Sequence, residues 1–228
     1  MRYVFIHGAG CNSEVFAAQR DAFSESVALD LPAHGKAGGY ADTIEGFADA
    51  VAADLERLEI QRAVLCGSSM GGAIALELAL RRHPSVHAAV LLGSGARLRV
   101  APAIFSELLH DFEAAAHTLA CRMFAVQEAR LIDAVATMLL ATGRTQTVAD
   151  FRACDAFDRV ERLGEIAVPV LALTGEHDQL TPPKYASLAA GRIPGAQARI
   201  VEAAGHLAML ERPRETNAAL ASFLERLA

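Results

Sequence analysis

The sequence predicts an α/β fold in which a mainly parallel, six-stranded sheet is covered by helices on both faces. Short apolar runs bounded by Gly, Pro or Asp alternate along most of the chain with longer segments of helical period. Strands that are buried on both faces of a parallel sheet have this continuous apolar character. The 228 residues are 53% hydrophobic and 21% charged, a composition that supplies one large buried core.

Each predicted element follows from a local pattern. Strands are predicted where four or five apolar residues lie together, and helices where apolar side chains recur every three or four positions. Because a helix separates most consecutive strands, neighbouring strands are expected to run parallel. The predicted strands are residues 3–6, 27–31, 63–66, 88–92, 170–174 and 199–203, and the predicted helices are residues 15–23, 44–58, 73–80, 185–190 and 216–227.

The stretch from residue 97 to residue 164 departs from this alternation. It contains several helical patterns and no good strand pattern, so we expect a helical lid inserted into a core formed by residues 1–96 and 165–228. No Gly/Ser-rich linker separates the two parts. The lid is therefore expected to pack directly on the core.

Charge and cysteine content argue against several classes of function. A formal net charge of −6 lacks the basic footprint of nucleic-acid or anionic-lipid binding, and no apolar run approaches the roughly 18 residues of a membrane span. Four scattered cysteines without Cys/His clusters indicate reduced thiols and no metal site. The apolar run before His7 is only four residues long, 3–6, too short for a secretory signal. We expect a cytoplasmic protein without nucleic-acid or membrane partners.

The segment from Gly67 to Gly71 follows a predicted strand and precedes a predicted helix. In this context its Gly-x-Ser-x-Gly spacing is typical of a nucleophile elbow, a sharp turn that lifts Ser69 clear of the sheet. The N–H of Met70, at the helix N-terminus, is a candidate donor to a developing oxyanion. Ser68 has no glycines at this spacing and is interpreted as a small residue of the turn.

The glycine-rich loop His7-Gly8-Ala9-Gly10 directly follows the first predicted strand. Such a turn can aim a backbone N–H at the mouth of the sheet, so we expect this loop to supply the other oxyanion donor. His7 itself is interpreted as a structural residue.

Two loops that follow later strands carry the remaining candidates. Asp178 lies after the fifth predicted strand, at the edge where open α/β sheets gather ligand-binding groups, although loop carboxylates also stabilise turns. His206 follows the last strand. The chain order Ser69, Asp178, His206 is that of a serine–acid–histidine triad on such a sheet, and we predict these three as catalytic residues. Glu176 and His177 precede Asp178 in its turn and are poorer candidates.

Five motifs extend over essentially the whole chain: His7-Gly8, Asp30-Leu31-Pro32-Ala33-His34-Gly35, Gly67-Ser68-Ser69-Met70-Gly71-Gly72, Gly175-Glu176-His177-Asp178 and Ala204-Gly205-His206. With them the chain resembles the α/β-hydrolase superfamily, and within it small esterases of the pimeloyl carrier-protein methyl ester esterase kind. The resemblance implies a triad of Ser69, Asp178 and His206 with the N–H groups of Ala9 and Met70 as oxyanion donors. It also implies that the sheet lacks the usual N-terminal hairpin.

The resemblance further implies hydrolysis of a small-molecule carboxylic ester through an acyl-enzyme, without a metal or organic cofactor. Asp30 matches a structural residue of the family, and Ala9 replaces an aromatic residue of many relatives, which leaves the acyl side of the pocket roomier. The apolar lid predicts a short-to-medium, apolar acyl group. Eight side chains are candidates for the pocket, with plain helix packing as the alternative for each: Leu108, Phe112, Met123, Phe124, Met138, Leu139, Leu180 and Leu207.

Other activities remain open on the same triad, because fold does not fix the reaction. A lactonase or a carbon–carbon bond hydrolase would be favoured if Arg97, Arg122 or Arg144 pointed inward, since a carboxylate-bearing substrate needs a partner. A small-ligand-binding protein without turnover is a third candidate, although it would need no triad. The sequence does not indicate an oligomeric state.

Overall fold

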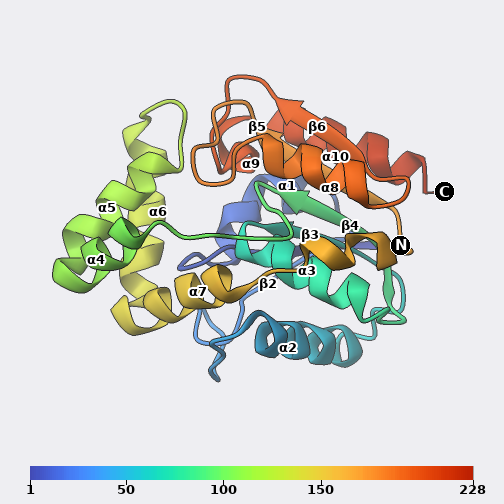
Figure 1. Ribbon diagram of the computed structural model, residues 1–228, viewed down its shortest axis with the longest axis horizontal. Coiled ribbons are helices and arrows are strands. Elements are labelled where there is room, and N and C mark those ends of the chain that lie inside the picture. Colours follow the sequence, from blue (N-terminus) through green and yellow to red (C-terminus); the bar gives the residue numbers. More distant parts are fainter. Residues whose placement is uncertain (228) are drawn as a thin grey trace.

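A six-stranded parallel sheet forms the centre of the molecule (Figure 1). The computed structural model describes residues 1–227 of the chain. The strand order is β2-β1-β3-β4-β5-β6 and every neighbouring pair is parallel, which confirms the predicted fold class. The strands are β1 (Arg2–Ile6), β2 (Val27–Leu29), β3 (Ala63–Ser68), β4 (Val86–Leu92), β5 (Val170–Gly175) and β6 (Gln197–Val201).

The central strands are buried on both faces, which explains their apolar composition. Every residue of β3 and β5 is buried, whereas the edge strand β6 leaves Ile200 56% exposed. Ile6 at the end of β1 pairs with Gly67 of β3, and Gly67 pairs with Leu91 of β4. The carboxyl ends of these strands therefore lie at one edge, and the loops that follow them are neighbours.

Two strands end earlier than predicted. The last strand pairs with β5 over Gln197–Val201 rather than at 199–203, and it ends there because Ala203 takes a left-handed φ of 51°. β2 ends two residues early, where the N–H of Leu31 bonds to the ring of His7 instead of to a strand. Both β2 and β6 thus end early because a turn begins there and brings loop residues toward the carboxyl edge of the sheet.

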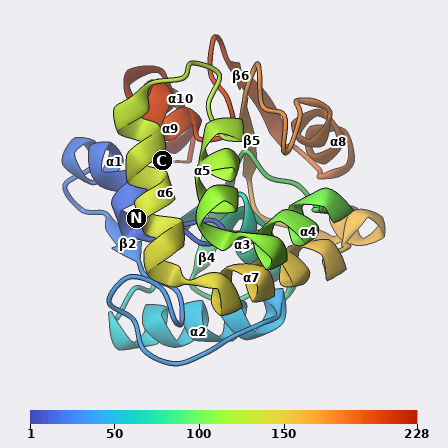
Figure 2. The same ribbon diagram turned by 90° about the vertical axis from the view of Figure 1, so that its left-hand side faces the viewer.

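Helices cover both faces of the sheet. They are η1 (Ser13–Phe16), α1 (Ala17–Ala22), α2 (Ile44–Arg57), α3 (Met70–Leu80), α4 (Pro102–His110), α5 (Phe112–Arg122), α6 (Ala129–Thr142), α7 (Arg144–Ala156), η2 (Val160–Glu165), α8 (Lys184–Arg192), α9 (Ala208–Glu211) and α10 (Pro213–Glu225). On one side α2 contacts α3, and η2 links α3 to α8, while α1, α9 and α10 contact one another on the other side (Figure 2).

Helix starts follow capping and glycine content. Thr43 caps α2 by accepting the N–H of Gly46 at 3.1 Å, so this helix begins where it was predicted. α3 begins at Met70, three residues before the predicted start, because the fold accepts Gly71 and Gly72 in its first turn despite their low helix propensity. Within residues 1–227, no helix combines the length and the hydropathy that crossing a lipid bilayer requires.

Helices α4 to α7 gather at one end of the sheet, at the left of Figure 1 and in front in Figure 2. Within the described residues 97–164 the only β contact is an isolated antiparallel bridge between Arg97 and Asp158. These two side chains also form an ion pair at 2.6 Å, and Arg99 donates to the carbonyl of Asp155 at 2.8 Å. The two ends of this helical segment are therefore joined to each other beside the sheet.

Candidate active site

Ser69 stands on the turn between β3 and α3. Its φ of 51° lies in the left-handed region, a strained conformation for a residue with a side chain. A Cβ on Gly67 would clash with the carbonyl of Gly71, and a Cβ on Gly71 would clash with the carbonyl of Ile6, which explains the two flanking glycines. Ser69 is half-buried, whereas the hydroxyl of Ser68 is buried and without a hydrogen-bond partner in residues 1–227.

The loop after β1 lies directly beside Ser69. A Cβ placed on Gly8 would lie 3.1 Å from the Cβ of Ser69. In the described part of the chain the N–H of Ala9 has no hydrogen-bond acceptor, and Met70, as the first residue of α3, has no carbonyl one turn earlier. Both predicted oxyanion donors thus carry N–H groups that the described fold leaves unpaired near the candidate nucleophile.

His7 is fully buried and supports this loop. Its Nε2 accepts the N–H of Leu31 at 3.0 Å, so its proton is on Nδ1, which donates to the carbonyl of Gly8 at 2.9 Å. Burial and the nearby His34 lower the pKa of His7 to about 3. The ring is therefore neutral at ordinary pH and fixed at both nitrogens.

Asp178 and His206 form a buried pair at the carboxyl edge of the sheet. Nδ1 of His206 lies 2.9 Å from Oδ2 of Asp178, and the hydroxyl of Thr181 lies 2.8 Å from the same oxygen and 3.1 Å from Nδ1. Burial alone would raise the pKa of Asp178, but His206 and the Thr181 hydrogen bonds outweigh it and lower that pKa. The ionised carboxylate keeps a proton on Nδ1 and leaves Nε2 as the basic nitrogen.

The turn that carries His206 is held by the loop between α5 and α6. The N–H of His206 donates to the carbonyl of Met123 at 2.8 Å. A Cβ on Gly205 would lie within 2.9 Å of backbone atoms in this loop, so only glycine fits there. Glu211 accepts the N–H of Gly205 and also that of Ala125 at 2.8 Å. The helical segment therefore helps to position this histidine.

Gly93, which follows β4, connects the surroundings of Ser69 to those of the Asp178–His206 pair. A Cβ on Gly93 would lie 3.1 Å from both Oδ2 of Asp178 and Nδ1 of His206. The N–H of Ser69 donates to Leu92, the residue before Gly93, at 2.9 Å. The structure thus brings the three predicted triad residues to one edge, while no hydrogen bond joins Ser69 to His206 within residues 1–227. Catalytic hydrogen bonds often tighten only when substrate binds.

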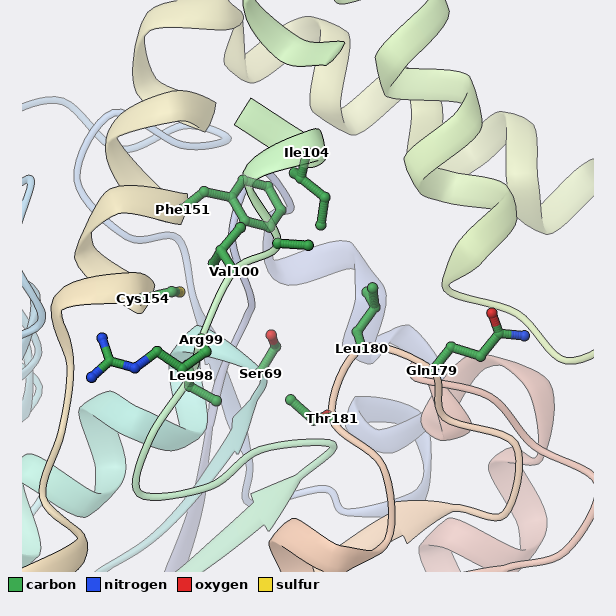
Figure 3. A pocket seen from close by; sticks show the side chains of 11 residues that line it. Ser69, Leu98, Arg99, Val100, Ile104, Phe151, Cys154, Gln179, Leu180 and Thr181 are labelled. Atoms are coloured by element: carbon green, nitrogen blue, oxygen red, sulfur yellow. The ribbon is translucent and has the colours of Figure 1, made fainter. Parts of the chain in front are cut away.

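A cavity of about 210 Å³ opens beside Ser69 (Figure 3). Its wall comes from the segment that leads into α4, from α7 and from the turn after β5. Ser69 and Thr181 both line it, and the hydroxyl of Thr181 is hydrogen-bonded to the Asp178–His206 pair. Its apolar lining residues include Leu98, Val100, Ala101, Ile104, Phe151 and Leu180.

Leu180 is the one predicted pocket residue that lines this cavity. Helical periodicity shows which side chains are buried, but it does not distinguish packing against another helix from lining a cavity. Leu139, for example, packs against Gly10 of the loop after β1. Leu108, Phe112, Met123, Phe124, Leu139 and Leu207 belong to the buried core, and Met138 packs partly buried against it.

Several residues of the site were not predicted from the sequence. Val100, Ile104 and Phe151 line the cavity because residues 97–100 and 155–158, near the two ends of the helical segment, lie together. This contact joins segments that are far apart in sequence. The hydroxyl of Thr181 carried a usable signal, since a threonine three residues after a turn aspartate can bond to its carboxylate.

Comparisons with known proteins agree with this architecture. The model of the alpha/beta hydrolase family matches residues 3–219. A pimeloyl-(acyl-carrier protein) methyl ester esterase of Cronobacter sakazakii is 28% identical over 99% of this chain and 93% of its own length. The enzyme with that name from Neisseria meningitidis is 30% identical over 96% of this chain and 75% of its own.

Solved structures show the same relationship. A thermophilic esterase superimposes with a TM-score of 0.89 at 31% identity and covers 99% of this chain and 90% of its own. Est816, described as an N-acyl homoserine lactone degrading enzyme, gives a TM-score of 0.87 at 27% identity over 98% and 93% of the two chains. With a family match over nearly its whole length, the chain belongs to the alpha/beta hydrolase family and is an esterase-like hydrolase.

Proposed function

We propose that this hydrolase cleaves carboxylic esters that carry a short-to-medium, apolar acyl group, with Ser69 as nucleophile. One observation carries the proposal: Thr181, which is hydrogen-bonded to the buried Asp178–His206 pair, lines the same cavity as Ser69. A nucleophile beside an apolar cavity, with a base and an orienting acid at the same edge of the sheet, provides the parts that acyl transfer requires.

In the first step Ser69 Oγ attacks the ester carbonyl while Nε2 of His206 takes the serine proton. Asp178 stabilises the imidazolium and keeps the Nδ1 proton in place, which its lowered pKa favours because the carboxylate stays ionised. The alcohol then leaves with the proton from His206, and a water molecule activated by the same nitrogen releases the acid from the acyl-enzyme.

The N–H groups of Ala9 and Met70 are proposed to bind the oxyanion of the tetrahedral intermediate. Support comes from the contact of Gly8 with Ser69 and from the position of Met70 at the start of α3. Each preorganised donor of this kind contributes about 3 kcal/mol to transition-state stabilisation.

The cavity supports a small acyl group. At about 210 Å³ it is smaller than the roughly 300–1,000 Å³ typical of sites for drug-sized ligands. Ile104 of α4 and Phe151 of α7 form part of its wall. We therefore propose that residues 97–164 act as a lid on a core of residues 1–96 and 165–228.

The arginines that would favour an acidic lactone or carbon–carbon substrate have other roles. Arg97 is paired with Asp158 at 2.6 Å, and Arg122 is paired with Glu107 at 2.8 Å. Arg144 is exposed at the start of α7. No arginine of this set lines the cavity beside Ser69. Arg99 does line it, but its guanidinium donates to the carbonyl of Asp155 at 2.8 Å and lies 3.7 Å from the carboxylate of Asp158. Because this arginine already has partners, a neutral ester is the better candidate.

The test is release of p-nitrophenol from acetyl, butyryl, octanoyl and palmitoyl esters by wild type, Ser69→Ala and Ser68→Ala. Ser68→Ala is the matched control, because its buried hydroxyl has no partner to lose. We expect wild type and Ser68→Ala to prefer the shorter esters, and Ser69→Ala to lose about a thousandfold or more.

Other outcomes would contradict specific parts of the proposal. Fast palmitoyl hydrolysis would contradict the short acyl group, and an active Ser69→Ala would contradict the nucleophile. A folded wild type that cleaves none of these esters would exclude simple-ester hydrolysis, and a lactone, a carbon–carbon substrate and binding without turnover would then be assayed.

A further inference from the structure

We propose that Asp150 of α7, together with His34, is a positioning residue of the oxyanion hole, so that the helical segment over the site also sets the geometry of the loop after β1. The inference rests on the proposed function, because an oxyanion hole matters only if Ser69 attacks a carbonyl. Asp150 and Gly10 lie 140 positions apart in sequence and are joined by a buried hydrogen bond.

The first step concerns the state of the pair. Nδ1 of His34 lies 2.8 Å from the carbonyl oxygen of Pro32, and Nε2 lies 2.8 Å from Oδ2 of Asp150. A carbonyl only accepts, so Nδ1 carries a proton, and Nε2 must carry another to donate to a carboxylate. Both side chains are fully buried. His34 is therefore an imidazolium paired with a buried carboxylate, and its pKa is accordingly raised despite burial.

The second step concerns the other groups that are hydrogen-bonded to the carboxylate of Asp150. Oδ2 of Asp150 also accepts the N–H of Gly10 at 2.8 Å, and Oδ1 accepts from Gln146 at 2.8 Å. Thr142 donates to the carbonyl of Gly10 at 3.1 Å. Both backbone polar groups of Gly10 are thus bonded to side chains from the end of α6 and from α7. With a φ of 67°, Gly10 has no side chain of its own to restrict it, so these bonds supply the constraint.

The third step connects Gly10 to the candidate donor. The N–H of Ala9 and the carbonyl of Gly8 belong to the same peptide unit. The Gly8 carbonyl accepts a hydrogen bond from Nδ1 of His7 at 2.9 Å and another from the N–H of Cys11 at 3.2 Å. In a trans peptide the carbonyl and the N–H point in opposite directions, so a fixed carbonyl fixes the N–H. Asp150 fixes the next peptide unit, which carries the N–H of Gly10, so the backbone of Ala9 has little freedom to rotate.

The test compares kcat and KM for the preferred p-nitrophenyl ester in Asp150→Asn, Thr142→Val and Glu77→Gln. Glu77 is the control, because it is also a buried carboxylate with a partner, bonded to Arg159 at 2.9 Å, but lies outside the oxyanion loop. We expect Asp150→Asn to lose about ten- to a hundredfold in kcat with KM nearly unchanged, Thr142→Val to lose less, and Glu77→Gln to keep wild-type kcat.

A second readout separates positioning from stability. Ser69 Oγ adds to the carbonyl carbon of a trifluoromethyl ketone, its proton passes to Nε2 of His206, and the carbonyl oxygen becomes an oxyanion. The matching methyl ketone binds mainly without this addition. Asp150→Asn should raise the inhibition constant of the trifluoromethyl ketone by the same factor by which it lowers kcat. The inhibition constant of the methyl ketone should stay unchanged. If Asp150→Asn does not fold, His34→Leu/Asp150→Leu removes the whole pair, a change that protein cores often tolerate, and the same result is expected.

Each remaining outcome overturns a stated claim. Folded variants with wild-type kcat and trifluoromethyl ketone inhibition overturn the positioning role. Equal weakening of both ketones, or the same kcat loss in Glu77→Gln, also overturns it, because a general packing defect would then explain the data. A folded wild type that cleaves no ester overturns the proposed function and the inference with it, whereas an active wild type with unaffected variants overturns the inference alone.

Discussion

Two buried histidines, His206 and His34, each bond to a carboxylate, and the second ring nitrogen decides what each can do. In His34 that nitrogen donates to a backbone carbonyl, so the ring is fully bonded and can only hold structure. In His206, Nδ1 faces Asp178 and Nε2 remains for proton transfer. His206 was predictable from its place in the order of the triad. The partner of His34 was not, because Asp150 lies 116 positions away without a motif.

At the scale of a residue, Thr181→Val should impair the Asp178–His206 pair without removing it. The hydroxyl bonds to Oδ2 of Asp178 at 2.8 Å, while the N–H of Thr181 still donates to Oδ1 at 2.8 Å. A hydrogen bond to an ionised group contributes about 1.5–3 kcal/mol, so we expect kcat to fall about ten- to a hundredfold. Steady-state kinetics with the preferred ester measures this.

The same change has a pH signature. The Asp178 pKa is lowered in the folded state, so its contribution to stability is present above the ordinary value of 3.8 and is lost as the pH falls through the folded value. Thr181→Val removes a bond that lowers this pKa. The acid unfolding midpoint, followed by circular dichroism, should therefore move to higher pH, whereas Ser187→Ala, at an exposed position on α8, should leave it in place. An unmoved midpoint in Thr181→Val would contradict the assigned bond.

At the scale of elements, the parallel sheet and the elbow could be predicted, because apolar runs and glycine spacing are local signals. The start of α3 and the end of β6 could not be predicted to the residue. Gly71 and Gly72 lower the helix propensity of a turn that tertiary packing nevertheless stabilises. The end of β6 depends on the left-handed turn at Ala203, which no glycine or asparagine marks. The cavity wall depends on contacts between segments distant in sequence, which periodicity does not encode.

Glu211→Gln tests whether the α5–α6 loop and the turn of His206 act as one element. Oε1 of Glu211 accepts the N–H groups of Ala125 and Val126 at 2.8 and 3.1 Å, and Oε2 accepts that of Gly205. Glutamine keeps one acceptor oxygen and turns its amide hydrogens toward backbone donors. We expect the free energy of unfolding, from urea titration, to fall by roughly 1–3 kcal/mol, and kcat to fall as His206 loses its support.

The control for this change is Glu202→Gln, which lies exposed in the preceding turn. It should leave both the unfolding free energy and kcat at the wild-type values, since surface substitutions away from such contacts change stability by less than about 0.5 kcal/mol. A Glu211→Gln variant that loses stability but keeps full kcat would show that the loop does not position His206.

At the scale of the whole molecule, the helical segment is bonded to the rest of the chain at separate places. Arg159 pairs with Glu77 of α3 at 2.9 Å and with Glu45 of α2, near where the segment rejoins the sheet. Asp150 bonds to Gly10, and the carbonyl of Met123 bonds to the turn of His206. The last two contacts reach the loop after β1 and the turn after β6, so these two parts of the site are stabilised by the helical segment, whereas the Arg159 pairs lie away from them.

The coupled histidines His7 and His34 predict a stability maximum near pH 6.5, their ordinary pKa. Their rings lie 4.9 Å apart, and burial with the charge of His34 lowers the pKa of His7 to about 3, while the Asp150 carboxylate raises that of His34. Below pH 6.5 His7 takes up a proton in the unfolded chain but stays neutral in the folded chain, so the free energy of unfolding falls on acidification. Above pH 6.5 the folded chain keeps a proton at His34 that the unfolded chain releases, so stability falls as the pH rises through the folded value.

Below pH 6.5 the loss of stability comes mainly from His7, because its ring has a pKa of about 3 in the folded chain and stays neutral above that pH. Between pH 6.5 and about pH 4.5 this amounts to roughly 2–3 kcal/mol in the free energy of unfolding, measured by urea titration. The carboxyl of Asp178 adds nothing in this window, because its lowered pKa lies below 3.8. An NMR titration of the folded protein provides the independent check, since the His7 ring signals should not move down to about pH 4.5. A His7 ring that titrates near pH 6.5 in the folded chain, or an unfolding free energy that stays flat across the window, would show that burial does not keep this ring neutral.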